Sequence, residues 1–248
     1  MTDTQPKLLA HRGYAARYPE NTREAIQAAV DAGARYVEFD IQLNRDQQPY
    51  LLHDSGFSRT ANVDVDIFEL SAGEIAGIPV SERQRLGAEG PDVFAPALVD
   101  VVGDLQGWPE VTAFVEIKKQ SVDRYGVGAV MDAVLPVLEP VADQCVIISF
   151  EKSVVELARH RAGIPIGWAF RSYDEECRHY AETLGPEFLF FNVDRLPSGA
   201  EKLWAGCWMW VIYEIIDPLE AMALFARGVG MVETMQPTEM HAGLTALK

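Results

Sequence analysis

The sequence predicts an α/β fold in which about eight parallel strands, each followed by a helix, close into a barrel. Short apolar runs alternate with amphipathic stretches along the chain, and this alternation is typical of parallel strands joined by helices. The length of 248 residues suits one such barrel as well as two small domains, and a hydrophobic content of 48% can fill a large core. Because about eight units can be counted and no stretch has the composition of a linker, we expect one barrel domain over residues 1–248 rather than an open doubly wound sheet.

The expected elements follow from apolar runs, caps and breakers, taken in chain order. Strands are expected at residues 7–10, 36–43, 49–52, 111–118, 145–150, 165–170, 188–192, 208–213 and 229–233. Helices are expected at residues 22–32, 68–75, 123–138, 151–161, 174–184, 198–205 and 218–227. Asn21 or Thr22 can cap the first helix and Gly33 can end it, while Pro136 is expected to break the third. Residues 54–96 would form an insertion after the second strand unit, on the catalytic rim of the barrel.

The charge balance limits the partners that the chain can have. It contains 37 acidic and 21 basic residues, a net charge of -16, which would repel nucleic acid and an anionic membrane surface. The cysteines at positions 145, 177 and 207 are widely spaced and form no CxxC pair, so neither a disulfide framework nor a zinc site is indicated. The N-terminus MTDTQPKLLA does not resemble a leader, and no later segment approaches the roughly 20 apolar residues of a membrane span. We therefore expect a cytoplasmic protein without a nucleic-acid partner or stable membrane association.

The central stretch of the chain, residues 35–54, carries two acids on one face of an expected strand. Glu38 and Asp40 lie two residues apart in a run of Val, Phe and Ile, so both carboxylates leave the strand on the same side. Two like charges on a buried strand are costly unless a cation lies between them, and a divalent metal that prefers oxygen is the simplest one. An edge strand with both acids in water fits the spacing equally well. His53 and Asp54, at the end of the next apolar run, favour a site, because chemistry in α/β folds gathers at strand ends.

Further polar side chains are expected at the same mouth of the barrel. Glu116 and Lys118 share a face of the strand at residues 111–118, and His11 and Arg12 directly follow the first strand. Three carboxylates with water suit Mg²⁺ or Ca²⁺, two histidines suit paired acid and base work near neutral pH, and two cations suit a phosphoryl group. These groups point to a phosphodiester hydrolase that uses a metal as Lewis acid. The convergent set comprises His11, Arg12, Glu38, Asp40, His53, Glu116 and Lys118.

Seven short motifs occur in a fixed order along the chain. They are His11-Arg12-Gly13, Pro19-Glu20-Asn21-Thr22, Glu38-Phe39-Asp40, His53-Asp54, Arg59-Thr60, Glu116-Ile117-Lys118 and Ser149-Phe150. Each motif alone is weak, but the ordered set, spread over residues 8–237, is specific and resembles the glycerophosphodiester phosphodiesterase family. The resemblance implies a TIM-type (β/α)8 barrel that hydrolyses small glycerophosphodiesters to glycerol 3-phosphate and an alcohol. It also implies one divalent cation, Mg²⁺, Ca²⁺ or Mn²⁺. The short insertion and the absent leader resemble the cytoplasmic bacterial members.

The resemblance further implies roles for particular residues. By position, Glu38, Asp40 and Glu116 would hold the metal, and His11 and His53 would be the general acid and base. Arg12 and Lys118 would bind the phosphate, and Trp210 would flank the glycerol moiety. The last strand departs from the family pattern, because Glu233 is an extra acid and Met235 stands where an acid is usual. This departure affects the expected substrate and not the expected metal centre.

Two other functions remain open. A related phospholipase D-like barrel would act on lipid head groups, but such proteins are usually secreted and disulfide-bearing. A barrel that only binds phosphorylated metabolites would have no need of three acids and two histidines in one complete set. The sequence does not indicate which alcohol moiety or which metal the protein prefers, or which histidine is the acid and which the base. It also does not distinguish a cyclic intermediate from direct attack by water, and it does not give the oligomeric state.

Overall fold

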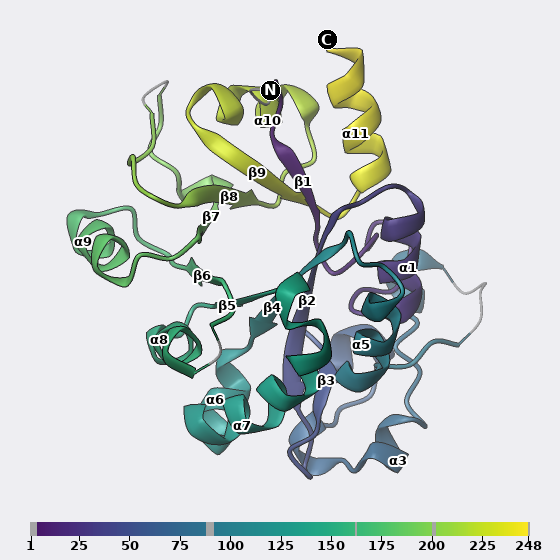
Figure 1. The fold of residues 1–248 in the computed structure, drawn as a ribbon. Coiled ribbons are helices and arrows are strands. Elements are labelled where there is room, and N and C mark those ends of the chain that lie inside the picture. The colour runs from purple at the N-terminus through teal and green to yellow at the C-terminus, as the bar shows by residue number, and fades with distance from the viewer. Residues whose placement is uncertain (1–3, 88–91, 162, 200–201, 248) are drawn as a thin grey trace.

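Eight parallel strands close into a barrel, as the alternation of strands and helices predicted (Figure 1). The structure is a computed structural model that describes residues 4–87, 92–161, 163–199 and 202–247. The barrel strands are β1 (Lys7–Ala10), β2 (Tyr36–Leu43), β4 (Thr112–Ile117), β5 (Cys145–Ser149), β6 (Ile166–Ala169), β7 (Phe188–Asn192), β8 (Met209–Tyr213) and β9 (Val229–Thr234). The strand β1 closes the barrel, because Ala10 pairs with Val37 of β2 and also with Thr234 of β9. The short strand β3 (Pro49–Leu51) pairs antiparallel with β2 outside this ring.

Helices follow most of the strands and cover the outside of the barrel (Figure 1). They are α1 (Arg23–Asp31), α5 (Leu98–Gln106), α6 (Lys119–Tyr125), α7 (Val127–Leu138), α8 (Lys152–Arg161), α9 (Glu175–Leu184), α10 (Pro218–Ala226) and α11 (Pro237–Ala246). Shorter turns are α2 (Ser58–Ala61), η1 (Ile67–Glu69), α3 (Ala72–Ile75), α4 (Arg83–Leu86), η2 (Glu139–Gln144) and η3 (Val193–Arg195). The predicted caps of α1 are confirmed, since the Thr22 side chain accepts from Ala25 N and Gly33 has a φ of +91°.

Three helix predictions need correction. The helix expected at residues 123–138 breaks at Gly126, where φ is 82°, and Pro136 lies inside α7. A glycine with positive φ ends one helix and starts the next at low cost, so it acts as the breaker here. The helix expected at residues 68–75 is divided into η1 and α3 by an extended segment. The helix expected at residues 198–205 is wrong for its described residues, which form none; Pro197 precedes them and Gly199 has a φ of +118°.

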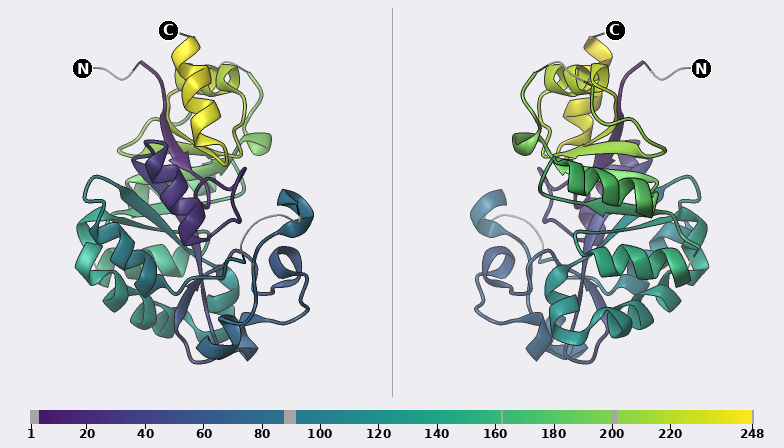
Figure 2. Two further views of the ribbon diagram at one scale, coloured as in Figure 1. Left: turned by 90° about the vertical axis from the view of Figure 1, so that its right-hand side faces the viewer. Right: turned by 90° about the vertical axis from the view of Figure 1, so that its left-hand side faces the viewer.

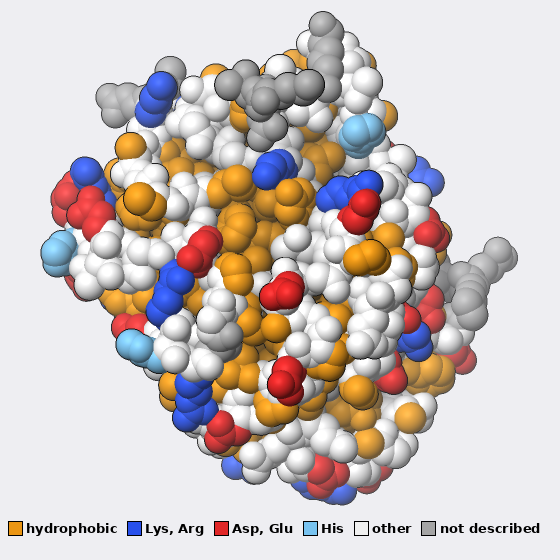
Figure 3. All heavy atoms as spheres, viewed as in Figure 1, with side chains coloured by type: hydrophobic (Ala, Val, Ile, Leu, Met, Phe, Trp, Pro, Cys, Tyr) orange, Lys and Arg blue, Asp and Glu red, His pale blue; other side chains and the backbone are white. Residues whose placement is uncertain are grey.

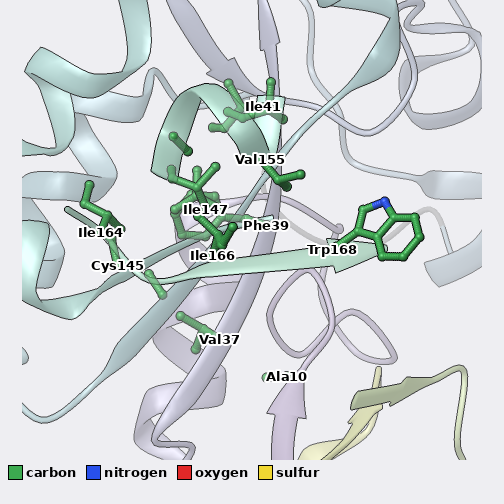
Figure 4. Packing of buried hydrophobic residues seen from close by; sticks show 14 of the residues in the cluster. Ala10, Val37, Phe39, Ile41, Cys145, Ile147, Val155, Ile164, Ile166 and Trp168 are labelled. Atoms are coloured by element: carbon green, nitrogen blue, oxygen red, sulfur yellow. The ribbon is translucent and has the colours of Figure 1, made fainter. Parts of the chain in front are cut away.

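Two apolar clusters separate the two faces of the strands. The larger one lies between the strands and the surrounding helices, and Figure 4 shows Ile147, Val155 and Ile166 within it. The other takes side chains from every barrel strand and therefore fills the barrel interior. Its buried members are Leu9, Phe114, Val146, Ile148, Ala169, Phe190, Val211 and Met231, with Tyr36 of β2 packed against them. Because both faces of these strands are covered, their sequences are almost continuously apolar.

The segment between β3 and α5 has an apolar cluster of its own. Its buried residues are Tyr50, Leu52, Phe57, Ile67, Leu70, Ile75, Val80, Val93 and Ala95. In Figure 2 this segment, drawn in blue, projects from the barrel next to the connection between β1 and α1. The Arg85 guanidinium donates to the backbone oxygens of Ala15 and Tyr18 in that connection. The segment is thus attached to the barrel beside the ends of β1 and β2.

The surface reflects the acidic composition. On the face shown in Figure 3, hydrophobic side chains gather along the middle with single acids among them, and most basic side chains lie toward the edge. Among the described residues, no helix is by itself long and apolar enough to cross a membrane. The bent pair Lys119–Tyr125 and Val127–Gln144, at 117°, meets that test only when taken together.

The three cysteines should differ in reactivity. Cys145 is buried on β5, and burial raises the pKa of its thiol to about 12, while Cys207 is exposed. The thiolate is the reactive form, so we expect a thiol reagent to label Cys207 rapidly and Cys145 only after unfolding. Peptide mapping by mass spectrometry of briefly labelled native protein checks this. Rapid labelling of Cys145 would contradict the burial of β5.

Candidate active site

The barrel interior changes from apolar to polar within two residues on almost every strand. Side chains alternate along a strand, so the residue two positions beyond an interior side chain points to the same side. The successive interior residues are Leu9 and His11, Tyr36 and Glu38, Phe114 and Glu116, Ala169 and Arg171, Val211 and Tyr213, and Met231 and Glu233, whereas Ile148 of β5 is followed by the apolar Phe150. Because the strands are parallel, these polar residues meet at the carboxyl-terminal mouth of the barrel.

A pocket of about 370 Å³ opens at this polar layer. It is lined by His11, Arg12, His53, Glu116, Lys118, Lys119, Gln120, Asp123, Ile148, Phe150, Ala169, Arg171, Phe190, Tyr213, Glu214 and Glu233. Five of the eight predicted site residues are therefore brought together in one pocket. Glu38 and Asp40, which are each 1% exposed, adjoin it through Arg12 and Lys118.

The structure does not bring Trp210 to this pocket. Its ring packs on the outer face of β8 beside Phe170 and Tyr173, and its indole N–H donates to the backbone oxygen of Trp204. Val211 and Tyr213 have the inward parity on this strand, so Tyr213 is the aromatic residue of β8 that lines the pocket. The position that the resemblance implied for Trp210 is therefore corrected to the outer layer.

Three carboxylates share the mouth of the barrel with one lysine. Lys118 Nζ lies 2.8 Å from Glu116 Oε1 and 3.1 Å from Asp40 Oδ1. Arg12 adds its backbone N–H, which donates to Glu38 Oε2 at 3.0 Å, and its Nε lies 3.2 Å from Asp40 Oδ2. The acids and cations therefore lie close together at the mouth of the barrel, as the strand pattern predicted.

Burial and neighbouring charge shift the pKa values of these acids in different directions. Burial and the nearby Asp40 raise the pKa of Glu38 well above its usual value. Burial also raises the pKa of Glu116, although Lys118 opposes this. For Asp40 burial acts in the same upward direction, but Lys118 and Arg12 outweigh it and hold the pKa below its usual value. The two cations thus stabilise the ionised form of Asp40, while burial disfavours the ionised forms of Glu38 and Glu116.

These residues fit a divalent cation. Glu38 Oε1 and Asp40 Oδ1 are buried and accept no hydrogen bond in the described part of the chain, although Lys118 Nζ is near the second. Among the described residues, two groups bring three ligand atoms within 4.8 Å of one another: Glu38 with Asp40 and Glu116, and His11 with Glu38 and Glu233. The first group offers only oxygen, which Mg²⁺ and Ca²⁺ prefer.

The loop after β1 places His11 and Arg12 by an unusual backbone. Arg12 and Gly13 have φ values of 55° and 79°. A Cβ on Gly13 would lie 2.5 Å from the backbone carbon of Ala25, so only glycine fits there. His11 is 8% exposed, and burial with the adjacent Arg12 lowers its pKa well below the usual value. The sharp turn therefore presents a neutral imidazole and a guanidinium to the same pocket.

Asn21 and Glu20 lie just before the cap of α1 and contact side chains of the site. Asn21 Nδ2 donates to Asp40 Oδ2 at 2.8 Å, and Asp40 N donates to Asn21 Oδ1 at 2.9 Å. This two-way contact fixes the orientation of the Asp40 carboxylate. Glu20 accepts from Arg12 and from Arg59. Of the two predicted caps of α1, Thr22 and not Asn21 is the cap.

His53 is held by a carboxylate and an arginine. Its Nδ1 lies 2.7 Å from Asp54 Oδ1, and Arg59 Nε donates to Asp54 Oδ2 at 2.7 Å. The hydrogen bond with His53, aided by Arg59 against partial burial, lowers the pKa of Asp54. An ionised carboxylate only accepts, so Nδ1 of His53 carries the proton and Nε2 is left as the acceptor.

Glu233 is the member of the layer whose placement the sequence did not settle. It is 4% exposed, lines the pocket, and shares one possible ligand group with His11 and Glu38. Burial and the charge of Glu116 raise its pKa well above the usual value. The signal in the sequence was its inward parity with Met231, two residues earlier on β9.

Comparison with known proteins agrees with this geometry. A model of the glycerophosphoryl diester phosphodiesterase family matches residues 11–192. The chain is similar to glycerophosphodiester phosphodiesterase 1 of Mus musculus, at 33% identity over 110 residues, which is 44% of this chain and 33% of that protein. It also resembles a glycerophosphodiester phosphodiesterase of Bacillus altitudinis, at 42% identity over 57 residues, 23% of each chain. The matches thus span a third or less of the length of these relatives.

Solved structures share the whole fold. A phosphodiesterase of Oleispira antarctica, in complex with the product sn-glycerol-3-phosphate, superposes with a TM-score of 0.80 at 18% identity, covering 97% of both chains. A putative glycerophosphoryl diester phosphodiesterase of Silicibacter pomeroyi gives 0.83 at 16% identity, covering 99% of this chain and 95% of that one. At such identities the likeness establishes the barrel.

Proposed function

The chain belongs to the glycerophosphoryl diester phosphodiesterase family, and from this premise we propose that it hydrolyses glycerophosphodiesters to glycerol 3-phosphate and an alcohol. The observation that carries the proposal is the single polar layer of one barrel domain, in which three acids, two histidines and two cations meet beside one pocket. The product bound in the Oleispira antarctica structure supports a small-molecule substrate of this kind.

One divalent cation, Mg²⁺, Ca²⁺ or Mn²⁺, would be held by Glu38, Asp40 and Glu116. When bound, such an ion supplies Lewis-acid stabilisation of charge on a phosphoryl oxygen. We favour this group over His11, Glu38 and Glu233 because it is made of oxygen alone and leaves the imidazole of His11 without a metal bond. Asn21 supports the choice, since its side-chain N–H donates to the Asp40 carboxylate while its side-chain oxygen accepts from Asp40 N.

Arg12 and Lys118 bind the phosphate in this proposal. Both line the pocket, and each is held in place by acids, Arg12 by Glu20 and Lys118 by Glu116. A positioned cation loses little side-chain entropy when an anion binds, so the pair can orient the phosphodiester for attack. Trp210 is not part of this arrangement, and Phe150 and Tyr213 supply the aromatic wall of the pocket.

The two histidines transfer protons in this proposal: one takes a proton from the attacking hydroxyl and the other gives a proton to the departing alkoxide. Because Asp54 occupies Nδ1 of His53, the free Nε2 can take the proton of the attacking hydroxyl, and we assign the general base to His53. His11 then protonates the departing alkoxide. A bound phosphodiester would bring negative charge to the buried imidazole of His11 and so favour its protonated form.

The products distinguish this proposal from its alternatives. We expect glycerophosphocholine to give glycerol phosphate and choline, and lysophosphatidylcholine to remain uncleaved, when both reactions are followed by ³¹P NMR. Phosphocholine as product would place the cleavage on the other ester bond. Faster release of head group from the lysophospholipid would favour the phospholipase D-like function, and binding without turnover would favour a phosphometabolite-binding barrel.

A further inference from the structure

We propose that Arg59 is a positioning residue that keeps the candidate base in register with the phosphate and metal groups. The inference rests on the proposed function, because it concerns the placement of His53 relative to Arg12. Arg59 lies on α2, in the segment after β3, and none of its atoms lines the catalytic pocket. It acts through a chain of alternating charges that starts at His53 and ends at Asp40.

The first half of the chain fixes the imidazole. Asp54 uses one oxygen for His53 Nδ1, at 2.7 Å, and the other for Arg59 Nε, also at 2.7 Å. The carboxylate therefore cannot rotate without breaking one of two charge-assisted hydrogen bonds. This holds one tautomer and one ring orientation of His53, which sits on a loop and is only partly buried.

The second half reaches the barrel. The two terminal nitrogens of Arg59 donate to the two oxygens of Glu20, at 2.8 Å and 2.6 Å. Glu20 Oε1 also accepts from Arg12 Nη1 at 2.9 Å, and Arg12 Nε lies 3.2 Å from Asp40 Oδ2. The Glu20 side chain is 5% exposed and that of Arg12 is 12% exposed, so water screens these interactions little.

The geometry of arginine is what makes the connection. Arg59 uses Nε for Asp54 and both terminal nitrogens for Glu20, so one rigid plane joins two carboxylates that lie on different segments. A lysine in its place has one nitrogen and cannot make the same fork. The orientation of Asp54 is thereby tied to that of Glu20.

Arg59 does not simply attach the inserted segment to the barrel, because other residues already do so. Arg85 donates to the backbone oxygens of Ala15 and Tyr18, and Glu82 accepts from Glu20 N at 2.7 Å. Glu82 is in turn held by Arg85. The attachment would survive the loss of the Arg59 fork, so the fork serves orientation.

Arg59→Gln and Arg59→Lys test the proposal, with Arg83→Gln as the matched control. Arg83 lies on the same segment and pairs with Asp92 on the surface. We expect Arg59→Gln to lower kcat for glycerophosphocholine by about 10-fold to 100-fold with little change in KM, the size seen when partners of site residues are removed. Arg59→Lys should have the melting temperature of wild type but the lowered kcat of Arg59→Gln. Arg83→Gln should match wild type in both kcat and melting temperature.

A second measurement does not need turnover. The ¹⁵N chemical shifts of His53 should report a single tautomer protonated at Nδ1 in wild type and a mixture of tautomers in Arg59→Gln. Unchanged His53 shifts, or a kcat that recovers in Arg59→Lys together with the melting temperature, would overturn the positioning role. If wild type shows no turnover on any glycerophosphodiester, the proposed function fails, while the shifts still decide the role of Arg59.

Discussion

Glu38→Gln should abolish metal binding and lower turnover by about 10³-fold, the equivalent of about 4 kcal/mol of lost Lewis-acid stabilisation. Glu38 belongs to both groups of possible ligands, and one of its oxygens is buried and accepts no hydrogen bond from the residues that the structure describes. The amide keeps the shape of the side chain but not its charge. Isothermal titration of metal-stripped protein with Mg²⁺, Ca²⁺ and Mn²⁺, and assay of glycerol phosphate release, check the two effects.

The same substitution should lower the stability that bound metal adds, but raise the stability of the metal-free protein. In metal-free protein it removes a buried carboxyl group whose ionised form is disfavoured by burial and by Asp40, and we expect the melting temperature to rise by about 2–4 °C for each kcal/mol relieved. Glu214→Gln is the matched control, because Glu214 lines the same pocket outside both ligand groups and accepts from Asn192. Wild-type metal affinity in Glu38→Gln, or equal loss in Glu214→Gln, would contradict the assigned centre.

His53→Gln should lower kcat by about 10²-fold to 10⁴-fold, the usual contribution of one general base or acid. The glutamine keeps a polar side chain of similar length but cannot exchange protons near neutral pH. Because the His53 side chain is 31% exposed and belongs to neither group of possible metal ligands in the described part of the chain, we expect the melting temperature and the metal affinity to stay near wild type. Steady-state kinetics, thermal unfolding and metal titration on one preparation separate these quantities.

His179→Gln serves as the control for the histidine substitution, since His179 is exposed on α9, away from the pocket. A kcat for His53→Gln within about threefold of wild type would show that His53 carries no proton transfer in the slow step.

The barrel could be predicted because its strands are short apolar runs bounded by turn residues. Residues 7–10, 36–43 and 188–192 have the predicted bounds in the structure. The helices were predicted less completely than the strands. Two of them, α5 and α11, were not among the predicted helices, because neither begins with a side-chain cap. The break lies at Gly126 and not at the predicted Pro136, because the glycine adopts a positive φ.

The acids of the site could be predicted by strand parity, because Glu38 and Asp40 interrupt an otherwise apolar strand. The resemblance alone placed Trp210 in the site, and strand parity could not test that placement, since β8 is apolar on both faces and a continuous apolar run does not reveal which side points inward. Only the cluster to which each side chain belongs shows that Val211 and Tyr213 point into the barrel and Trp210 outward.

Long-range pairing accounts for what the sequence could not provide. Arg59 and Glu20 are separated by 39 positions, and nothing in either local pattern indicates the contact between them. The segment after β3 was expected on the catalytic rim, but its own apolar cluster and its ion pairs to the β1 connection depend on tertiary packing. Glu233 could be noted as an extra acid, but its place within 4.8 Å of ligand atoms of His11 and Glu38 required the closed barrel.

The most direct test of the central claim is release of glycerol phosphate from glycerophosphocholine, glycerophosphoethanolamine and glycerophosphoglycerol by wild-type protein that has been stripped of metal and then supplied with Mg²⁺, Ca²⁺ or Mn²⁺. We predict no release from the stripped protein and full release after at least one cation is restored. Equal turnover with and without metal would contradict the role given to Glu38, Asp40 and Glu116. No turnover on any of the three, with metal bound, would contradict glycerophosphodiester hydrolysis itself.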